Sequence, residues 1–281
     1  MIGIQITSFG GPEVLKSTEF PKPAAKEGEI VIRVEAAGVA RADTLQRQGK
    51  YPPPPGASEI PGLDVAGIVD SVASSVGGFN PGDRVCAILT GGGYAEFCAV
   101  PATQVLPIPD GWSYVEAATL PENLFTVYDN LITRAGLKSG ETALIHGGSS
   151  GIGTMAIMLS RAWGATALVT AGTNEKCAEC VSLGAAQGIN YKQSDFVAEA
   201  KRFTNGNGVD VVLDLVGGSY LPRNLDVLAP EGRVVIIASH GGRTGELDIA
   251  KLMSKRARVM GSTMRARTPA QKGEVTRRLL R

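Results

Sequence analysis

The feature that most constrains this 281-residue sequence is a glycine-rich turn between an apolar segment and an amphipathic one. Residues 142–146 form a short apolar run, the turn reads GGSSGIG from Gly147 to Gly153, and apolar residues then recur at helical spacing up to Gly164. Glycines in such a turn let the backbone approach a pyrophosphate, whose charge meets N–H groups and the positive end of the helix dipole. A glycine-rich turn can also serve only to let a strand and a helix pack closely, so its context decides. Strand, turn and helix in this order predict the start of a βαβ unit.

The same pattern continues through the second half of the chain. Short apolar runs without strict alternation recur at 167–170, 209–216 and 233–239. Such runs are typical of strands whose two faces are both covered by helices, as in a parallel sheet. We therefore predict a Rossmann domain with a doubly wound parallel sheet over residues 121–264, and dinucleotide binding at its glycine turn.

The first half has a different character. Residues 29–36 alternate between apolar and charged positions, which is the period of a half-buried strand, and 65–72 and 84–89 look similar. Proline- and glycine-rich turns separate these segments. Residues 1–120 are thus predicted to form a β-rich domain, which makes the fold class α/β with a second, β-rich domain.

Composition excludes several classes of protein. A hydrophobic content of 43% is too high for a disordered chain, and 28 basic against 27 acidic residues give no overall field toward nucleic acid or membrane. No apolar run reaches the roughly 20 residues of a membrane span, and four cysteines are too few for a disulfide framework. We expect a cytoplasmic protein without membrane or nucleic-acid partners.

Charge is nevertheless unevenly distributed. Residues 251–281 contain ten basic residues and one acid, Glu274. We interpret this basic tail as a solvated helix face that normally meets acidic residues missing from this sequence; a surface for RNA is the alternative.

The cofactor type is predicted from the end of the second strand of the βαβ unit. An NAD-binding domain usually has an acid there that accepts the ribose 2′-hydroxyl. This sequence has Gly172 and Thr173 instead, with Lys176 close behind, a setting that suits a 2′-phosphate. NADPH is therefore favoured over NADH. Alternatively, Thr173 only caps a helix that begins at Asn174, and Lys176 is a solvated residue of its first turn.

Several short motifs carry a resemblance to a known family. They are FGGPE from Phe9, RAD from Arg41, QRQG from Gln46, PPPGAS from Pro53, PGDRV from Pro81 and LGA from Leu183. Over residues 1–268 the chain resembles the zinc-independent quinone oxidoreductases of the medium-chain dehydrogenase/reductase superfamily. The segment 46–58, with GGG at 91–93 and DLVGGSY at 214–220, is most similar to the branch induced by a tumour suppressor in animals and to its bacterial relatives.

The resemblance implies a GroES-like substrate-side domain over residues 1–120, continued by 265–281, beside the Rossmann domain, with the active site in the cleft. Relatives continue for several dozen residues past the position of Arg281, so the GroES-like domain is expected to be incomplete. Relatives also commonly have Asn where this chain has Ala40, which removes a polar contact near the nicotinamide or the substrate.

The resemblance also implies the site residues. NADPH contacts are expected at Thr126, Ser150, Gly151, Ile152, Gly172, Thr173, Lys176, Tyr191, Val216, Ser239, His240, Met264 and Arg265. Tyr51 and Asp43 are expected on the substrate side as catalytic residues. By themselves, Tyr51 could pack on the prolines that follow it, Asp43 could be a helix-cap acid, and His240 could be an ordinary loop residue.

A catalytic zinc is not expected. The zinc-dependent alcohol dehydrogenases of the superfamily need Cys and His ligands, but here those positions read Val39-Ala40 and Gly62-Leu63-Asp64. The two histidines, His146 and His240, both lie in the second half, where His146 is interpreted as a strand end. Cys177 and Cys180 are interpreted as packing residues rather than as a metal or redox pair.

Without a Lewis acid, the substrate should already be electron-poor. The leading hypothesis is an NADPH-dependent quinone oxidoreductase in which Tyr51 positions the quinone and water supplies protons. The alternatives are a reductase of enones or enoyl thioesters, and a non-catalytic NADPH-binding sensor or RNA-binding protein. The apolar strand at 258–262 could pair with its copy at a sheet edge, so a homodimer or homotetramer is expected.

Overall fold

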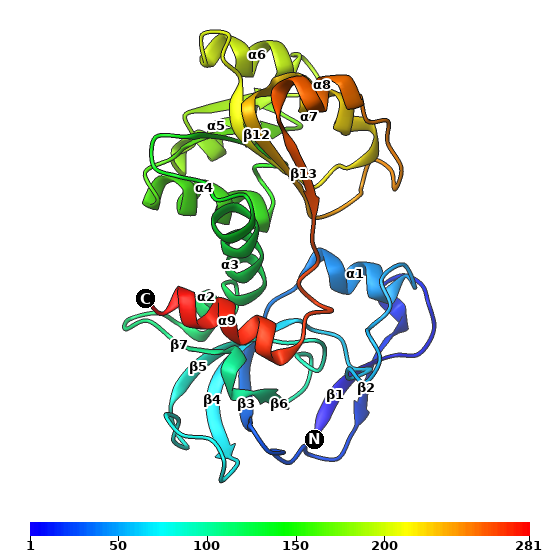
Figure 1. Cartoon of the computed structure of the whole chain (residues 1–281). Helices are drawn as coiled ribbons and strands as arrows, with labels where there is room; N and C mark the ends of the chain where they lie inside the picture. Colours follow the sequence, from blue (N-terminus) through cyan, green and yellow to red (C-terminus); the bar gives the residue numbers. More distant parts are fainter. The chain divides into compact units, whose positions relative to one another are not determined.

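The computed structural model describes all 281 residues. They divide into two compact units, one formed by residues 1–125 with 264–281 and the other by residues 126–263. The first unit is rich in antiparallel strands, and the second contains a parallel sheet with helices (Figure 1). The predicted fold class is therefore confirmed.

The second unit is built on a six-stranded parallel sheet in the order β10-β9-β8-β11-β12-β13. Its strands are β8 (Thr142–His146), β9 (Thr166–Ala171), β10 (Gln187–Asn190), β11 (Val209–Asp214), β12 (Leu228–Ile236) and β13 (Arg258–Gly261). The strand order reverses between β8 and β11, where doubly wound sheets bind their ligands. The four apolar runs of the sequence are all strands, whereas β10, with only four residues, was not predicted.

Helices cover this sheet, and buried residues of the strands and helices form two separate apolar clusters. The helices are the end of α3 (Pro121–Val127, of which Thr126 and Val127 belong to this unit), the π-helical segment Tyr128–Arg134, α4 (Gly151–Ala162), α5 (Asn174–Ser182), α6 (Phe196–Phe203), α7 (Leu221–Val227) and α8 (Ile249–Lys255). Within β8, Ala143 and Ile145 join the cluster that contains Ile157 of α4, while Leu144 joins the cluster that contains Phe196 of α6. Successive strand residues are thus buried on opposite faces, which explains why the strands do not alternate with polar residues.

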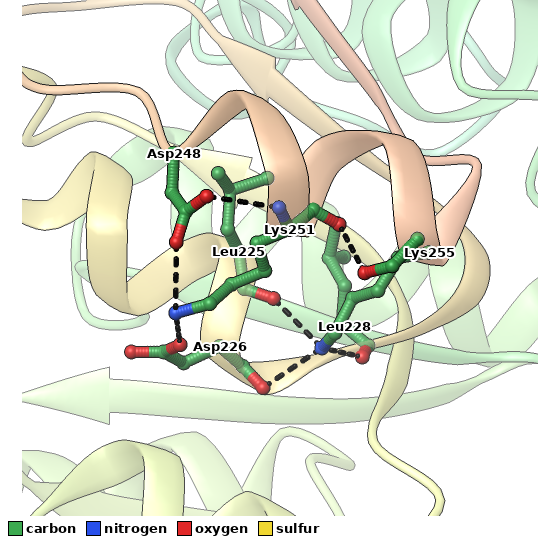
Figure 2. A network of polar contacts seen from close by, with 7 residues as sticks. Leu225, Asp226, Leu228, Asp248, Lys251 and Lys255 are labelled. Atoms are coloured by element: carbon green, nitrogen blue, oxygen red, sulfur yellow. Dashed lines mark hydrogen bonds and ion pairs between the residues drawn. The ribbon is translucent and has the colours of Figure 1, made fainter.

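Helix α8 is attached to the end of α7 by two lysines (Figure 2). The Lys255 ammonium donates to the carbonyl oxygens of Leu225, Asp226 and Leu228, and Lys251 pairs with the Asp226 carboxylate. The last carbonyls of a helix lack partners within it, and basic side chains commonly satisfy them. Two residues of the basic tail are therefore used to dock α8.

The first unit contains a five-stranded antiparallel sheet in the order β6-β3-β4-β5-β7 and a separate two-stranded sheet. The strands are β1 (Ile2–Ile6), β2 (Leu15–Glu19), β3 (Glu29–Ala37), β4 (Asp64–Val72), β5 (Arg84–Ile88), β6 (Phe97–Pro101) and β7 (Val105–Pro107). Ile30 and Ile32 of β3 pack in one core with Val65 and Val69 of β4, as the alternating pattern predicted.

Short helical segments complete this unit. They are Pro12–Val14, α1 (Arg41–Arg47), the 3-10 turn Ala102–Gln104, α2 (Tyr114–Ala117) and α9 (Pro269–Leu279). Helix α9 packs closely on the 3-10 turn: a Cβ added to Gly273 would lie only 2.9 Å from Thr103 Cβ. None of the helices combines the length and the apolar character needed to cross a membrane.

The basic tail differs from its predicted role as a solvated helix face. Arg265 is 4% exposed and Lys272 is fully buried, whereas Arg277 and Arg278 on the outer side of α9 pair with Glu274. Only part of the tail is solvated, because Arg265 and Lys272 face partners from the N-terminal half that the local sequence does not reveal.

Candidate functional site

The glycine turn after β8 is held by contacts that only glycine permits. A Cβ on Gly153 would lie 2.3 Å from the Gly147 carbonyl oxygen and 2.5 Å from that of Gly148. Real Cβ atoms do not approach backbone oxygens so closely, so the first turn of α4 can fold back on the loop only without a side chain at this position.

The turn presents the start of α4 as an anion site. Ser150 caps the helix, and its hydroxyl accepts the N–H of Gly153 at 3.0 Å. The N–H groups of Gly151 and Ile152 lie in the first helical turn, where a helix offers no carbonyl partner. This arrangement suits a pyrophosphate, and it brings the predicted residues Ser150, Gly151 and Ile152 together.

The carboxyl ends of β9 and β10 form a second part of the site, which we call the ribose corner: Gly172, Thr173, Lys176 and Tyr191. A Cβ on Gly172 would lie 3.0 Å from the Tyr191 hydroxyl, so these two residues are neighbours. The Thr173 hydroxyl accepts the N–H of Lys176 at 3.3 Å, which is the capping role considered for it. The Lys176 side chain is exposed beside this corner.

A second lysine at the ribose corner was missed from the sequence. Lys192 Cε lies 3.7 Å from the position of a Cβ on Gly172. The residue follows a strand too short to be predicted, so only the pairing of β10 with β9 places it here.

The loops after β11 and β12 bring a third group together. The N–H of His240 donates to the Leu215 carbonyl at 3.3 Å, and the N–H of Gly241 donates to that of Val216 at 2.7 Å. Ser239 and His240 are exposed. The predicted residues Val216, Ser239 and His240 therefore lie together at the carboxyl end of the sheet, where open α/β sheets bind ligands.

Thr126 stands apart from these three groups. It lies in α3 and is 8% exposed, and its backbone carbonyl accepts the amide of Asn130. Its hydroxyl is buried without a hydrogen-bond partner. A buried hydroxyl without a partner is costly, so a polar ligand group at Thr126 would satisfy it.

In the first unit, Asp43 is surrounded by donors. Its Oδ1 accepts the N–H of Gly62 at 3.2 Å, and its Oδ2 accepts the N–H of Ala40 at 2.8 Å and the hydroxyl of Tyr94 at 2.9 Å. The bond to Ala40 caps α1, so the cap role considered for Asp43 is present in the structure. Its catalytic role stays a prediction.

Arg265 anchors the segment that re-enters this unit. Its Nε donates to the Thr90 carbonyl at 3.0 Å, its Nη2 to Gln46 Oε1 at 2.7 Å, and its Nη1 to the Tyr51 carbonyl at 3.4 Å. The guanidinium also lies over the Tyr51 ring, 5.2 Å from its centroid. The neighbouring Met264 is 5% exposed. Arg265 thus has protein partners of its own, and cofactor contacts by Met264 and Arg265 stay predictions.

Tyr51 is half-buried beside this arginine. Burial raises the pKa of its phenol above the ordinary value, and the nearby Glu122 adds to the effect. The phenol therefore keeps its proton at neutral pH and can donate a hydrogen bond.

Two acids of this unit were missed as site residues. Asp64 is 3% exposed; its Oδ2 accepts the N–H of Glu122 at 3.3 Å, and its Oδ1 is buried without a partner. Burial, with the charge of Glu122, raises the pKa of Asp64 to about 8. Burial likewise raises the pKa of Glu122 to about 7, with the charge of Asp43 adding to the effect.

Lys272 completes this group, which we call the acid–base cluster: Asp43, Asp64, Glu122, Arg265 and Lys272. Its ammonium is fully buried and donates to the Thr90 hydroxyl at 2.8 Å. Burial lowers its pKa to about 8, against the opposing charge of Glu122. Family resemblance pointed to two members of this cluster, Asp43 and Arg265, whereas Asp64, Glu122 and Lys272 were not predicted.

A pocket of about 360 Å³ lies in the same unit. Its lining includes residues 54–58, Thr90, Gln104 and Arg265. Residues 54–58 belong to the PPPGAS motif, one of the motifs that carry the family resemblance.

Burial bears on two other sequence interpretations, those of the cysteine pair and of His146. Cys177 and Cys180 are free and buried, and Cys180 packs in the core, as interpreted. His146 ends β8 and is fully buried. No group of three or more His, Cys, Asp or Glu side chains in the structure is arranged to hold a metal ion.

Comparisons with known proteins agree in both halves of the chain. Residues 26–110 match the alcohol dehydrogenase GroES-like domain, and residues 151–280 match the zinc-binding dehydrogenase family. A human quinone oxidoreductase is 33% identical over 266 residues, which cover 94% of this chain and 80% of the relative.

Solved structures are similar along nearly the whole chain. The Escherichia coli quinone oxidoreductase complexed with NADPH has a TM-score of 0.85 and 32% identity, over 99% of this chain and 86% of that one. The enoyl reductase CurK has a TM-score of 0.86 and 27% identity, over 99% of this chain and 86% of that one.

Proposed function

Because the chain belongs to the quinone oxidoreductase family of the medium-chain dehydrogenases and reductases, we propose that it is an NADPH-dependent quinone oxidoreductase that works without zinc. The family predicted from the motifs is thus confirmed, and with it the class of oxidoreductases. The assignment to the tumour-suppressor-inducible branch stays a prediction.

The ribose corner is the observation that carries the choice of NADPH. It places the Thr173 hydroxyl, the Tyr191 hydroxyl and two lysines, Lys176 and Lys192, around the end of β9, with no acid at the strand tip. A 2′-phosphate would find cations and hydroxyls here, whereas NAD-binding sites usually have an acid. The NADPH complex of the Escherichia coli relative supports the same choice.

The remaining cofactor contacts follow from the fold. The pyrophosphate would lie at Gly151 and Ile152, and Val216, Ser239 and His240 would line the next stretch at the carboxyl end of the sheet. The buried Thr126 hydroxyl, which lacks a partner, fits a polar group of the cofactor. When bound, NADPH supplies the hydride.

The substrate class follows from the side chains that are absent from the usual zinc positions. Val39-Ala40 and Gly62-Leu63-Asp64 provide no Cys or His ligand, so no Lewis acid would polarise an alcohol or ketone. A quinone or conjugated carbonyl accepts a hydride without such help, because the charge delocalises into the acceptor. Tyr51 would orient the acceptor oxygen by donating its phenol hydrogen bond, and the quinone takes up one proton for each hydride.

The experiment compares NADPH and NADH as electron donors to 9,10-phenanthrenequinone. Lys176→Ala should lower kcat/KM for NADPH by roughly 10- to 100-fold, the value of a lost charge-assisted contact, and leave that for NADH unchanged. Lys138→Ala, which removes an exposed lysine elsewhere in the same unit, is the matched control. Dialysis against a chelator should leave turnover intact. The proposal fails if the protein binds NADPH without reducing the quinone, or if turnover requires zinc.

A second candidate is an enone or enoyl reductase, favoured by the likeness to the enoyl reductase CurK. Rates on quinones and on alkenals of similar size separate the two. A higher kcat/KM for alkenals would reverse the order of the proposals.

We also propose that the protein is a homodimer or homotetramer. Strand β13 occupies one edge of the six-stranded sheet, where its copy could pair. Sizing in solution tests this; a monomer at micromolar concentration would contradict it.

A further inference from the structure

A buried chain of polar side chains connects two of the loops predicted to contact the cofactor. It consists of Thr170 at the end of β9, His146 at the end of β8, Asn224 in α7 and Asp214 at the end of β11. All four are at most 1% exposed. None of them was assigned to cofactor or substrate, so the chain is unexplained by the proposed function.

The hydrogen bonds of this chain fix its direction. The Asp214 carboxylate can only accept, so the Asn224 amide turns its Nδ2 to Asp214 Oδ2, at 2.9 Å, and its oxygen to His146. Asn224 Oδ1 lies 2.8 Å from His146 Nε2, which must therefore carry a proton. The other ring nitrogen, Nδ1, lies 3.0 Å from the Thr170 hydroxyl and accepts its hydrogen when the ring is neutral.

The surroundings of His146 favour its neutral form. The rings of Phe196 and Tyr220 meet the imidazole edge to face, with centroids 4.8 and 4.9 Å away. Burial lowers the pKa of His146. The hydrogen bond to Asn224 and the charge of Asp214 oppose this effect, and the charge of Arg223 acts in the same direction as burial. The hydrogen bond to Asn224 requires a proton on Nε2, and the lowered pKa favours the neutral ring, in which Nδ1 accepts from the Thr170 hydroxyl.

Each end of the chain holds backbone N–H groups of a different loop. At one end, the Thr170 hydroxyl accepts the N–H of Gly147, the first residue of the glycine turn, at 3.4 Å. At the other, Asp214 Oδ1 accepts the N–H groups of Val216 at 2.6 Å and of Gly217 at 3.0 Å. The two loops come from different strands and are linked through these side chains.

We propose that His146 is a positioning residue that couples the glycine turn after β8 to the loop after β11, so that the two loops take up their cofactor-binding conformations together. This inference rests on the proposed use of NADPH by the same site. It gives His146 no contact with the cofactor and no proton transfer to substrate.

The first test removes one hydrogen-bonding group from the row of buried polar side chains, at the end distant from Val216 and Gly217. Thr170→Val keeps the shape of the side chain but removes its hydroxyl. Amide hydrogen exchange is measured on the protein without NADPH. Exchange at Val216 and Gly217 should become about fivefold faster, as expected when a buried hydrogen bond in a network is lost.

The matched control is Thr166→Val in the same strand, whose hydroxyl takes no part in the chain; it should leave Val216 and Gly217 unchanged. In a His146→Phe background, Thr170→Val should add no further change at these two amides. A change confined to Gly147, or equal changes in both threonine variants, would overturn the proposal.

A spectroscopic test needs no folding-sensitive variant. The protein has two histidines, so nitrogen-15 labelling of histidine gives the ring-nitrogen signals of two imidazoles, and His240→Gln removes one of these two sets. His146 should show a neutral ring with its proton on Nε2. A proton on Nδ1 would contradict the direction of the hydrogen bonds from Asp214 to Thr170.

The link to the cofactor is tested with adenosine 2′,5′-bisphosphate, which represents only the adenosine end. It should slow exchange at Val216 and Gly217 in the wild type, and do so several-fold less in Thr170→Val. If the wild type fails to bind this probe, the proposed cofactor is wrong, while the exchange data without ligand still decide whether the two loops are coupled. Equal slowing in both proteins would overturn the coupling.

Discussion

The glycine turn after β8 and the acid–base cluster of the first unit are both dense polar arrangements, but they are assembled in different ways. The turn is made by seven consecutive residues, Gly147 to Gly153, and its key contacts join backbone atoms within them. The cluster joins side chains from α1, β4, α3, the segment after β13 and α9, up to 229 positions apart between Asp43 and Lys272. The first therefore leaves a readable motif, and the second leaves almost none.

The largest effect is expected at the turn. Gly153→Ala places a methyl group within 2.3 Å of a backbone oxygen that cannot move without opening the first turn of α4. We expect a loss of stability of about 4 kcal/mol or more, together with loss of measurable NADPH binding. Thermal unfolding and calorimetric titration measure both.

Gly261→Ala is the matched control, because a Cβ there meets only the Ile236 carbonyl, at 3.8 Å. Its stability and NADPH affinity should stay near those of the wild type. If Gly153→Ala bound NADPH normally, position 153 would not require glycine, and the turn would not be the locally determined arrangement that it is taken to be in the comparison with the cluster.

A smaller effect is expected when the cluster loses Asp43. Asp43→Ala leaves two backbone N–H groups and the Tyr94 hydroxyl without their acceptor, which should cost about 2–4 kcal/mol. Denaturant unfolding measures the loss. Asp110→Ala, at an exposed acid, should change stability by less than about 0.5 kcal/mol. Equal stability of the two variants would mean that Asp43 is no structural centre of the cluster.

The smallest effect concerns pH and the buried Asp64. The pKa of this acid is about 8 in the folded protein and near 4 in an unfolded chain. The folded state therefore holds the extra proton between these values, and its stability falls as the pH rises from about 4 to about 8. Asp64→Asn cannot ionise and should lose this share of the slope, becoming more stable than the wild type by about 1–2 kcal/mol at pH 8 relative to pH 6.5.

Denaturant unfolding of both proteins across this pH range tests the prediction. Asp70→Asn, at a surface acid paired with Lys22, serves as the control and should retain the wild-type slope. Parallel stability profiles for Asp64→Asn and the wild type would show that Asp64 is ionised in the folded protein.

The fold was largely predictable because its signals are periodic or local. Apolar runs marked β8, β9, β11 and β12, and alternation marked β3. The four-residue β10 was missed, since a strand so short carries no period of its own. Its absence from the prediction also hid Lys192 at the ribose corner.

The candidate site was predictable only in part. Ser150, Gly151 and Ile152 follow from the turn, and Gly172 with Thr173 from the end of a predicted strand. Thr126, Tyr191 and Val216 came from family resemblance alone. The partners of Asp64 and Lys272 could not be inferred, because the burial of a charge depends on residues that are distant along the chain.

The sequence by itself determined the parallel sheet and the glycine turn, and it placed Gly172 and Thr173 at the end of a strand that has no acid. These depend on backbone geometry and on neighbours within a few residues, so the order of residues is enough. Only the tertiary structure decided that His146 joins Thr170 to Asn224, and that the basic tail buries Arg265 and Lys272 beside acids. Hydrogen-bond direction and desolvation both depend on which groups meet in space, and chain order alone does not specify that.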